Sequence, residues 1–436
     1  MATARDIAFR LLVDLEKKHS YSNIALDEAL KRADMDERDR RFCTALFYGT
    51  LERLYTLDAI IADNLDKPAD KLSAEIRTIL RMGLYQLLYM DSVPDNAAVS
   101  ESVALAKRGR NPAASGFVNA VLRSFIRKDK RLPKQRDRLH EMALEYSCPV
   151  WLVKKWHDEY GDNACESILK ASLGKAPEYI RLNTLKADAS EICGMLEQQG
   201  AEIRDLGGGS ALISGTGSVE RMEAYKKGLF HVQDISCQLC CQALDPQRGE
   251  TVLDLCAAPG GKTFTIAELM KDEGRVLAFD LHENRARLIK SGAERLGLKS
   301  VEAGVNNAKV FNSELPMADR VLCDVPCSGL GVIRRKPEIK YKTREELERL
   351  PEIQLEILEA SAGYVKPGGV LVYSTCSLSK AENEDVAEAF LARHPDFSPS
   401  PLGDAFGQRS KVTSITIFPD MYDSDGFFIA KFCRLR

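Results

Sequence analysis

Residues 253–264 read LDLCAAPGGKTF, and this stretch decides the fold of the second half of the chain. The apolar segment TVLDLC precedes it and the helical pattern of TFTIAELM follows, which predicts a turn from a strand into a helix. The phosphate-loop motif G-x-x-x-x-G-K-[ST] fits at Gly261 to Thr263, but Cys256 replaces its first glycine. The dinucleotide fingerprint G-x-G-x-x-G fails because alanines and a proline stand at its first positions. The turn therefore predicts a ligand other than a triphosphate or a dinucleotide.

Predicted strands alternate with predicted helices from residue 233 onward. The strands are TVLDLC, RVLAFD, a weaker SVEAGV, DRVLCDV and GVLVYSTC. The helices between them are TFTIAELM, ENRARLIKSGAERLG, REELERLPEIQLEILEASAGYV and AENEDVAEAFLARH. This order predicts a parallel, doubly wound sheet with helices on both faces, and TSITIF with GFFIAKF predicts a closing hairpin. We expect a Rossmann-like α/β domain over residues 233–436.

The first 130 residues are predicted to be entirely helical. Apolar residues recur at helical spacing from Ala4 to Leu15 and again from Val118 to Phe125, and Thr3 is a candidate N-cap. Nothing between them alternates with the period of two that is typical of a strand. An all-α bundle over residues 1–130 is the simplest architecture.

A polar, basic linker, KDKRLPKQRDR, separates this bundle from a mixed region. Residues 140–232 predict a helix that ends at Gly161, a strand at YIRLNTLK, a helix that ends at Gly200 and a short strand within GGGSALISGTG. This order predicts a small α+β subdomain.

The composition indicates a water-soluble protein with reduced thiols. The N-terminal segment carries acidic residues and has no unbroken apolar run, so we expect no signal peptide, no membrane span and a cytoplasmic location. We also expect a monomer. Twelve cysteines are present, and Cys237, Cys240 and Cys241 form a C-x-x-C-C motif. No second Cys/His pair stands at matching spacing, so we predict a buried helix here and no metal site.

Positive charge is concentrated in two short runs, although the formal net charge of the chain is −3. Residues 123–138 hold eight Lys or Arg against two Asp, and residues 334–344 hold six against one Glu. Either run alone is typical of a solvated helix face. Two such runs favour a partner that carries phosphates, which is a nucleic acid.

Residues that follow the strands define the candidate site, because ligands bind beyond the carboxyl ends of such a sheet. Small residues from Cys256 to Gly261 allow a ligand to approach the backbone, and the next helix offers its N-terminal N–H groups. Asp280 ends the second strand and is placed to accept hydrogen bonds from ribose hydroxyls, with a helix N-cap as its alternative role. A ribose without a phosphate loop favours an adenosine ligand such as S-adenosylmethionine.

Two thiols stand at the ends of the next strands. Cys327 follows Asp324 in DVPCS, and Cys376 lies in STCS. A single cysteine here would be an ordinary buried residue, but two thiols beside a carboxylate fit carbon methylation of a pyrimidine. A thiolate that adds to C6 of cytosine makes C5 nucleophilic enough to accept a methyl group. Spacing alone does not choose which thiol attacks.

These motifs resemble a known enzyme family. LDLCAAPGGKT, DVPCSGLGVIRRKPEIKY and YSTCS are similar to the motifs of the Nop2/Sun/Fmu RNA 5-methylcytosine methyltransferases, and GVIRRKPEIKY resembles the branch that acts on 16S (small-subunit) ribosomal RNA. NAAVSESVALAK and GFVNAVLR resemble the antitermination factor NusB, an RNA-binding helical domain. RLNTLK and HVQDISCQL resemble the family's RNA-binding subdomain, so the resemblance covers most of the chain.

The resemblance implies a role for each matching residue. Cys376 would be the nucleophile, Cys327 would assist release of the product, and Asp324 would contact the cytosine and the methyl end of the cofactor. Asn307, with Asn306 as the alternative, stands where the family has an aspartate near the adenine. Arg334, Arg335 and Lys336 would bind RNA. S-adenosylmethionine would be bound by Asp280 at its ribose and by a loop of seven residues: Cys256, Ala257, Ala258, Pro259, Gly260, Gly261 and Lys262.

Three other interpretations are open. The same chemistry could act on transfer RNA, large-subunit RNA or DNA. A non-catalytic, NusB-like RNA-binding protein would have lost its thiol motifs, whereas both are complete. A nicotinamide dehydrogenase would need the glycine fingerprint that this chain lacks.

Overall fold

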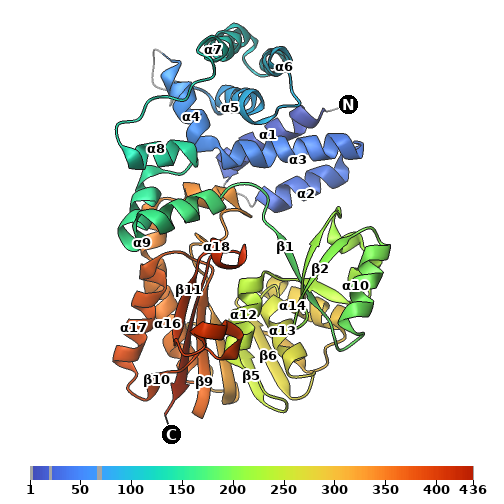
Figure 1. The fold of residues 1–436 in the computed structure, drawn as a ribbon, viewed down its shortest axis with the longest axis vertical. Coiled ribbons are helices and arrows are strands. Elements are labelled where there is room, and N and C mark those ends of the chain that lie inside the picture. The colour runs from blue at the N-terminus through green and yellow to red at the C-terminus, as the bar shows by residue number, and fades with distance from the viewer. Residues whose placement is uncertain (1–2, 19–21, 66–70, 436) are drawn as a thin grey trace. The chain divides into compact units, whose positions relative to one another are not determined.

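The computed structural model describes residues 3–18, 22–65 and 71–435. The chain forms two compact units (Figure 1). The first comprises residues 1–174 with 333–341, and the second comprises residues 175–332 with 342–436.

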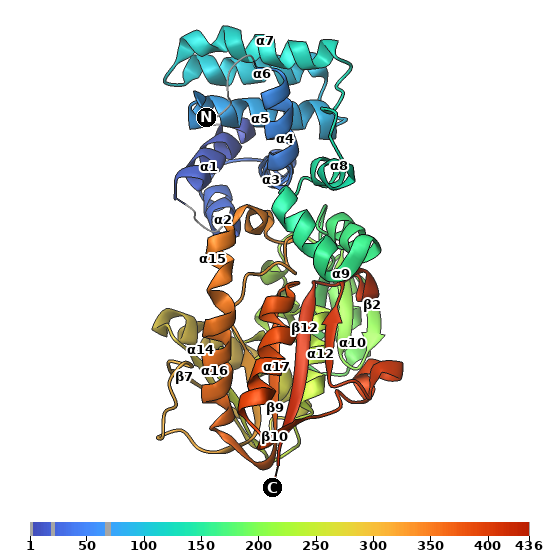
Figure 2. The same ribbon diagram turned by 90° about the vertical axis from the view of Figure 1, so that its left-hand side faces the viewer.

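The first unit is helical, as the apolar periodicity predicts. Figure 2 shows α5, α6 and α7 side by side in it. Ala8 and Leu12 of the first predicted stripe are buried, and the backbone N–H of Asp6 donates to Thr3 Oγ1 at 3.2 Å, which confirms Thr3 as a cap. The helices are α1 (Ala4–Lys18), α2 (Ser22–Arg32), α3 (Glu37–Glu52), α4 (Leu54–Asp63), α5 (Ala74–Tyr89), α6 (Asp95–Arg108), α7 (Ser115–Arg127), α8 (Arg138–Glu145) and α9 (Val150–Ala171).

Helix α9 contains a break at Gly161, where φ is 79° and ψ is 173°. The predicted helix ends there, and a further helical stretch follows directly. The linker before α8 is irregular, as predicted. Helices α8 and α9 belong to the first unit, whereas the sequence pattern places residues 140–171 with the α+β subdomain.

The second unit begins with the small α+β subdomain. Its antiparallel sheet has the order β2-β3-β1-β4. The strands are β1 (Glu178–Leu182), β2 (Glu202–Gly207), β3 (Ser210–Ser214) and β4 (Phe230–Val232), and the helices are α10 (Ala189–Gln198) and the short α11 (Glu223–Lys226). Helix α10 ends just before Gly200, as predicted.

The larger sheet has the order β10-β12-β9-β8-β5-β6-β7, and β11 pairs with β12. The strands β5 (Thr251–Asp254), β6 (Arg275–Asp280), β7 (Val301–Val305), β8 (Ala318–Asp324) and β9 (Val365–Thr375) are parallel. Antiparallel strand β12 (Phe427–Arg434) covers the edge of β9 and pairs with β10 (Phe397–Pro399) and β11 (Ser414–Ile417), which confirms the predicted hairpin.

Side chains of successive strand residues point to opposite faces of this sheet and enter two cores. Val252 and Val372 lie in the core beneath α12 (Ile235–Leu244), α13 (Gly261–Leu269) and α14 (Glu283–Leu296). Their neighbours Leu253 and Leu371 lie in the core beneath α16 (Leu350–Ala362) and α17 (Glu384–Arg393). Figure 1 shows these helix groups on either side of the sheet. The fold is therefore the predicted Rossmann-like α/β fold.

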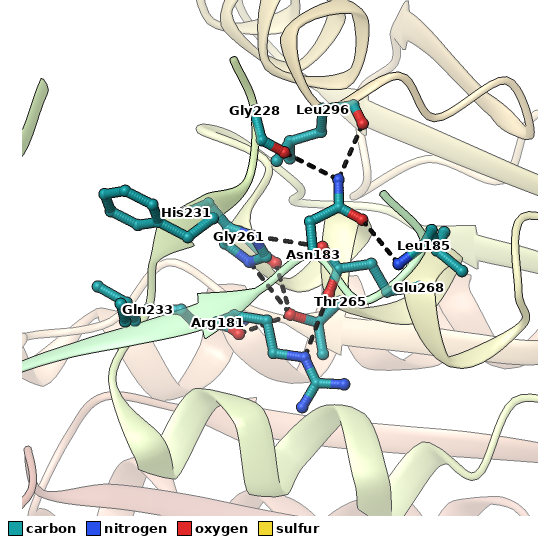
Figure 3. Close-up of polar contacts among 12 residues, drawn as sticks. Arg181, Asn183, Leu185, Gly228, His231, Gln233, Gly261, Thr265, Glu268 and Leu296 are labelled. Atoms are coloured by element: carbon teal, nitrogen blue, oxygen red, sulfur yellow. Dashed lines mark hydrogen bonds and ion pairs between the residues drawn. The ribbon is translucent and has the colours of Figure 1, made fainter. Parts of the chain in front are cut away.

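A buried polar cluster joins the α+β subdomain to α13 (Figure 3). Arg181 Nε of β1 lies 3.2 Å from Glu268 Oε2 of α13. Thr265 Oγ1 donates to Gln233 Oε1 at 2.6 Å and lies 3.3 Å from His231 Nε2. The cluster therefore fixes α13, the helix that begins at the ligand loop.

Asn183 adds a second buried link between the same two parts. Its Nδ2 donates to Gly228 O at 3.0 Å and to Leu296 O, at the end of α14, at 2.9 Å (Figure 3). The α+β subdomain and the helices on this face of the sheet are thus held as one body.

The cluster predicts a pH-dependent stability. Burial raises the pKa of Glu268 to about 8, despite the attraction of the Arg181 guanidinium. The folded state therefore holds a proton that the unfolded chain releases above pH 4–5, so stability falls as pH rises from about 5 to 8. Relative to Glu268→Gln, the wild type should lose about 1.4 kcal/mol per pH unit in this window. Amide hydrogen exchange in β1 and α13 measures this difference.

Glu223→Gln, at an exposed position, is the control. The difference in stability between this variant and the wild type should not depend on pH between about 5 and 8. His231 is neutral in the folded state, since burial lowers its pKa to about 3, and its contribution cancels between the two proteins. A difference that is independent of pH would contradict a protonated Glu268.

Candidate active site

Four neighbouring parallel strands end at one edge of the large sheet. Three of them end in an aspartate, Asp254 of β5, Asp280 of β6 and Asp324 of β8, and β9 ends at Thr375. The site predicted from the strand ends is thus assembled in one place, as expected for a sheet of this type.

The loop from residue 255 to 260 connects β5 to α13. Gly260 has φ 114°, and a Cβ built on it would lie 2.3 Å from the ring of Phe264. Only glycine fits this position. The turn therefore presents the first N–H groups of α13 to the strand ends.

The two residues that resemble a phosphate loop have other partners. Lys262 Nζ lies 2.8 Å from Asp324 Oδ2, and Thr263 Oγ1 donates to Asp254 Oδ2 at 2.7 Å. The ammonium and the hydroxyl that would contact phosphate and metal in a phosphate loop are bound to strand-end carboxylates. The motif therefore resembles a phosphate loop in sequence, but its lysine and threonine contact protein carboxylates and not a phosphate.

The ion pair of Lys262 and Asp324 is largely buried. Burial opposes the charge on Lys262, but the Asp324 carboxylate together with the thiols of Cys237 and Cys240 raises the pKa of Lys262 well above its usual value. Ser374 Oγ donates to the other oxygen of Asp324 at 2.8 Å. Asp324 is thus held from both sides, and Ser374 is a site residue that the sequence patterns did not identify.

Asp280 lies at the predicted ribose position and is 3% exposed. Its Oδ1 accepts from the N–H of His282, and its Oδ2 lies 3.2 Å from Arg285 Nη1. Arg285 also donates to Ala258 O at 2.8 Å, which ties the loop to β6. The N-cap residue of α14 is His282, so the alternative role of Asp280 as that cap is wrong.

Asp254 is a candidate ligand-binding residue that the motif analysis missed. Burial raises its pKa to about 7, and among the described residues its Oδ1 has no hydrogen-bond partner. Asp254 ends β5 just as Asp280 ends β6 and Asp324 ends β8. This shared position could have identified it from the sequence.

These features fit S-adenosylmethionine. The unpartnered oxygen of Asp254 and the rim carboxylate of Asp280 are acceptors for the ammonium and hydroxyl donors that this ligand carries. The small residues of the loop leave its backbone accessible, and a Cβ on Gly261 would meet nothing closer than 3.8 Å.

Asn306 and Asn307 follow β7 and differ in environment. Asn307 is exposed, and its Oδ1 accepts from the N–H of Lys309. Asn306 is buried, and its Oδ1 accepts from Asn312 at 3.4 Å. Asn307 remains the predicted contact for the adenine, with Asn306 as the alternative.

The two predicted thiols lie together, with 3.2 Å between Cys327 Sγ and Cys376 Sγ. The hydrogen bond from Cys327 lowers the pKa of Cys376, and the nearby Lys262 ammonium lowers it further, against burial. The same hydrogen bond and burial raise the pKa of Cys327. These opposite shifts make Cys376 the more acidic thiol of the pair and favour Cys327 as the donor of the hydrogen bond.

The second basic run is not a uniform exposed patch. Lys340 is fully buried, its Nζ donates to Glu52 O at 2.8 Å, and burial lowers its pKa to about 8. Arg334, Arg335 and Lys336 are half-buried, and each has a polar or electrostatic partner. Their predicted contact with RNA stays a prediction.

The first basic run extends from the last turns of α7 to the first residue of α8, and acidic residues neutralise much of it. Five of its eight basic side chains form ion pairs: Lys128 with Asp63, Lys130 with Asp95, Arg131 with Asp129, Arg136 with Asp137 and Arg138 with Glu166. Its attraction for phosphates is weaker than the sequence count suggests.

The cysteines of the C-x-x-C-C motif lie in α12, as predicted. Cys240 and Cys241 are buried, and burial raises the pKa of Cys240 to about 12. Within residues 3–18, 22–65 and 71–435, no group of three or more His, Cys, Asp or Glu side chains could hold a metal ion. No helix in these ranges has the length and apolar character that crossing a membrane requires.

Comparison with known families divides the chain into three matching segments. Residues 241–433 match the family described as 16S rRNA methyltransferase RsmB/F. Residues 2–127 match the NusB family, and residues 148–213 match the ferredoxin-like domain of RsmF/B-like methyltransferases. The resemblance predicted from the motifs is confirmed.

Individual proteins match over the whole chain. The probable ribosomal RNA small subunit methyltransferase B of Bacillus subtilis is 40% identical over 100% of this chain and 98% of its own length. The protein of the same name from Synechocystis is 38% identical over 99% of both. Among solved structures, that of PH0851 covers 98% of each chain with a TM-score of 0.82 and 29% identity.

Replacing Asp280 by alanine should weaken binding of S-adenosylmethionine. A hydrogen bond to a charged group contributes roughly 1.5–3 kcal/mol, so the affinity should fall about tenfold to a hundredfold. Calorimetry measures it, and Glu283→Ala, which removes an exposed carboxylate nearby, should bind normally. An unchanged affinity for Asp280→Ala would remove Asp280 from the cofactor site.

The thiol pair predicts an order of alkylation. At pH 7, iodoacetamide should modify Cys376 before Cys327, because the thiolate is the nucleophile. Cys327→Ala should slow modification of Cys376, since the hydrogen bond that lowers its pKa is lost, whereas Cys327→Ser keeps a donor and should slow it less. Mass spectrometry follows both sites. Faster labelling of Cys327 in the wild type would reverse the assignment.

Proposed function

Because the chain belongs to the RsmB/F family of 16S rRNA methyltransferases, we propose that it methylates C5 of a cytosine in 16S ribosomal RNA through a covalent bond between Cys376 and C6. The observation that carries this proposal is the pair of thiols 3.2 Å apart, with opposite pKa shifts, beside the ion pair of Asp324 and Lys262.

S-adenosylmethionine is the methyl donor of this family. It supplies an electrophilic methyl group when bound. We assign its binding to the loop from Cys256 to Lys262, to Asp280 at the ribose and to Asn307 near the adenine. Asp254 joins this set because its unpartnered oxygen lies at the same edge of the sheet.

Cys376 acts as the nucleophile. Its lowered pKa increases the thiolate fraction, and the thiolate adds to C6 of the cytosine, which makes C5 nucleophilic. Asp324 faces the ring, where it contacts cytosine and supports protonation at N3. Lys262 holds this carboxylate and keeps a positive charge near the attacking sulfur.

Cys327 acts after methyl transfer. Water accepts the C5 proton as the bond between Cys376 and C6 breaks, and the Cys327 thiol lies close enough to Cys376 to protonate the departing sulfur. Its raised pKa keeps the thiol protonated, so Cys327 does not compete as the nucleophile.

RNA binding is assigned to the NusB-like helices and to Arg334, Arg335 and Lys336. NusB-like helices alone would also fit a non-catalytic RNA-binding protein. The preserved geometry of both thiols argues against that alternative, since such a protein has no need for it. Transfer RNA and large-subunit RNA are the alternative substrates for the same chemistry.

Removing Cys376 and removing Cys327 should have opposite effects on the amount of covalent protein–RNA adduct. Cys376→Ala should be inactive and form no covalent RNA adduct. Cys327→Ala should attack and methylate but stall before elimination, so protein should accumulate on RNA in a denaturing gel. Addition and elimination are separate steps, and a residue that serves only the second leaves the first intact.

Glu223→Gln, at an exposed position of the short helix α11, is the control and should turn over without an accumulated adduct. An adduct in Cys376→Ala but not in Cys327→Ala would reverse the two roles. The absence of an adduct in both variants, with 5-fluorocytosine RNA as well, would exclude the covalent mechanism.

A further inference from the structure

A buried carboxylate connects the two loops that carry the thiols. Glu382 lies in a short 3-10 turn between β9 and α17, and it is 2% exposed. No motif in the sequence singled it out. Ser328 and Ser377, the residues that directly follow Cys327 and Cys376, are its partners.

The carboxylate accepts four hydrogen bonds. Oε1 accepts from Ser328 Oγ at 2.5 Å and from Ser377 Oγ at 2.7 Å. Oε2 accepts from the backbone N–H of Ser328 at 2.8 Å and from Gln354 Nε2 at 2.9 Å. Both oxygens are therefore satisfied by uncharged donors.

The partners of this carboxylate are themselves buried and tied to the thiol loops. Ser328, Ser377 and Gln354 are each 0% exposed, and the two serine oxygens lie 2.8 Å apart. Gln354 Nε2 also donates to Pro326 O, on the other side of Cys327, at 3.1 Å. The loop of Cys327 is thus held before and after the thiol.

The loop of Cys376 is held in the same way. The residue after Glu382 is Asn383, whose Nδ2 donates to Ser377 O at 2.9 Å and whose Oδ1 accepts from Thr375 Oγ1 at 2.6 Å. The short turn at Glu382 and Asn383 therefore fixes the backbone on both sides of Cys376.

A buried carboxylate among neutral donors is a costly group, because it has left water without gaining a cation. In the described part of the chain, no ion pair reaches Glu382. A neutral glutamine could fill the same volume at a lower desolvation cost. The carboxylate offers what an amide cannot: two acceptor oxygens and no donor, so that both hydroxyls and the N–H can converge on it.

We propose that Glu382 is a positioning residue that holds the two thiol loops at a fixed separation through Ser328 and Ser377. Its consequence for catalysis rests on the proposed function, in which Cys376 attacks and Cys327 assists release. Its consequence for the thiols does not depend on any substrate.

The negative charge of Glu382 also favours the hydrogen bond between the two thiols. It contributes to the raised pKa of Cys327, after the Cys376 hydrogen bond and burial. The other charged groups that act on Cys376 are Asp324, Lys262 and Asp425, and none of them is a partner of Glu382. A protonated Cys327 donates to Cys376, so Glu382 supports the hydrogen bond that generates the thiolate.

The test compares Glu382→Gln with the wild type in the absence of RNA. The rate of Cys376 alkylation by iodoacetamide is measured against pH, and its midpoint should move upward, which slows the reaction at pH 7 by about tenfold for each pH unit of the shift. Diamide should also oxidise the two thiols to a disulfide more slowly, because the sulfur atoms are no longer held together. S-adenosylmethionine binding should be unchanged.

Glu384→Gln is the matched control. Glu384 lies two residues away and accepts from Thr416 Oγ1 at 2.8 Å, and among the described residues it forms no hydrogen bond with either thiol loop. This variant should keep the wild-type alkylation profile and the wild-type rate of disulfide formation.

Turnover on RNA provides the second readout. A small displacement of a reacting group lowers rates steeply, so kcat of Glu382→Gln should fall about tenfold to a hundredfold while KM for RNA stays unchanged. Ser377→Ala, which keeps the carboxylate and one of its hydroxyl donors, should reproduce part of this loss. Its effect should be less than additive when combined with Glu382→Gln.

The outcomes separate this proposal from the proposed function. A lower melting temperature of Glu382→Gln with unchanged alkylation and disulfide rates would overturn it, because Glu382 would then serve only the stability of the fold. Altered thiol rates in a protein that does not methylate cytosine would support the positioning role and reject the proposed function.

Discussion

The ion pair between Lys262 and Asp324 is the interaction on which the rest of the site depends. It joins the first turn of α13 to the end of β8 and lies beside Cys376, where the Asp324 carboxylate raises the pKa of the thiol and the Lys262 ammonium lowers it. Pairing with such a carboxylate compensates part of the cost of burying an ammonium. The lysine that a phosphate loop would direct at phosphates is therefore paired with Asp324, and the proposed function assigns ligand binding to the loop backbone, Asp254 and Asp280.

Two buried polar groups support this arrangement on either side of the sheet. The cluster at Arg181 and Glu268 fixes α13 from the side of the α+β subdomain. Glu382 fixes the thiol loops from the opposite face of the sheet, beside α16 and α17. The candidate cofactor loop and the loop of Cys376 are thus each held by side chains outside the motifs, as a precisely positioned site requires.

Much of the fold follows from the sequence, because strand and helix periods are local properties of the chain. One long predicted helix, REELERLPEIQLEILEASAGYV, is two helices, α15 (Arg344–Glu348) and α16, and Pro351 in the first turn of α16 explains the break. The strand-end aspartates and both thiols were predictable from their place after each strand. The partners of Lys262 and Glu382 were not, since Asp324 and Ser328 lie 62 and 54 residues away along the chain. The burial of Lys340 could not be predicted either, because this residue lies within a run of charged residues.

The proposed activity of this chain is methylation of a cytosine at C5 in 16S ribosomal RNA. Bisulfite sequencing of ribosomal RNA from a strain that lacks the gene tests it most directly, because 5-methylcytosine resists conversion. One protected cytosine in 16S RNA should become convertible in the deletion strain and be protected again when the wild-type gene, but not the Cys376→Ala variant, is restored. Identical protection of all 16S cytosines in both strains, or a lost site in transfer RNA or large-subunit RNA instead, would contradict the claim.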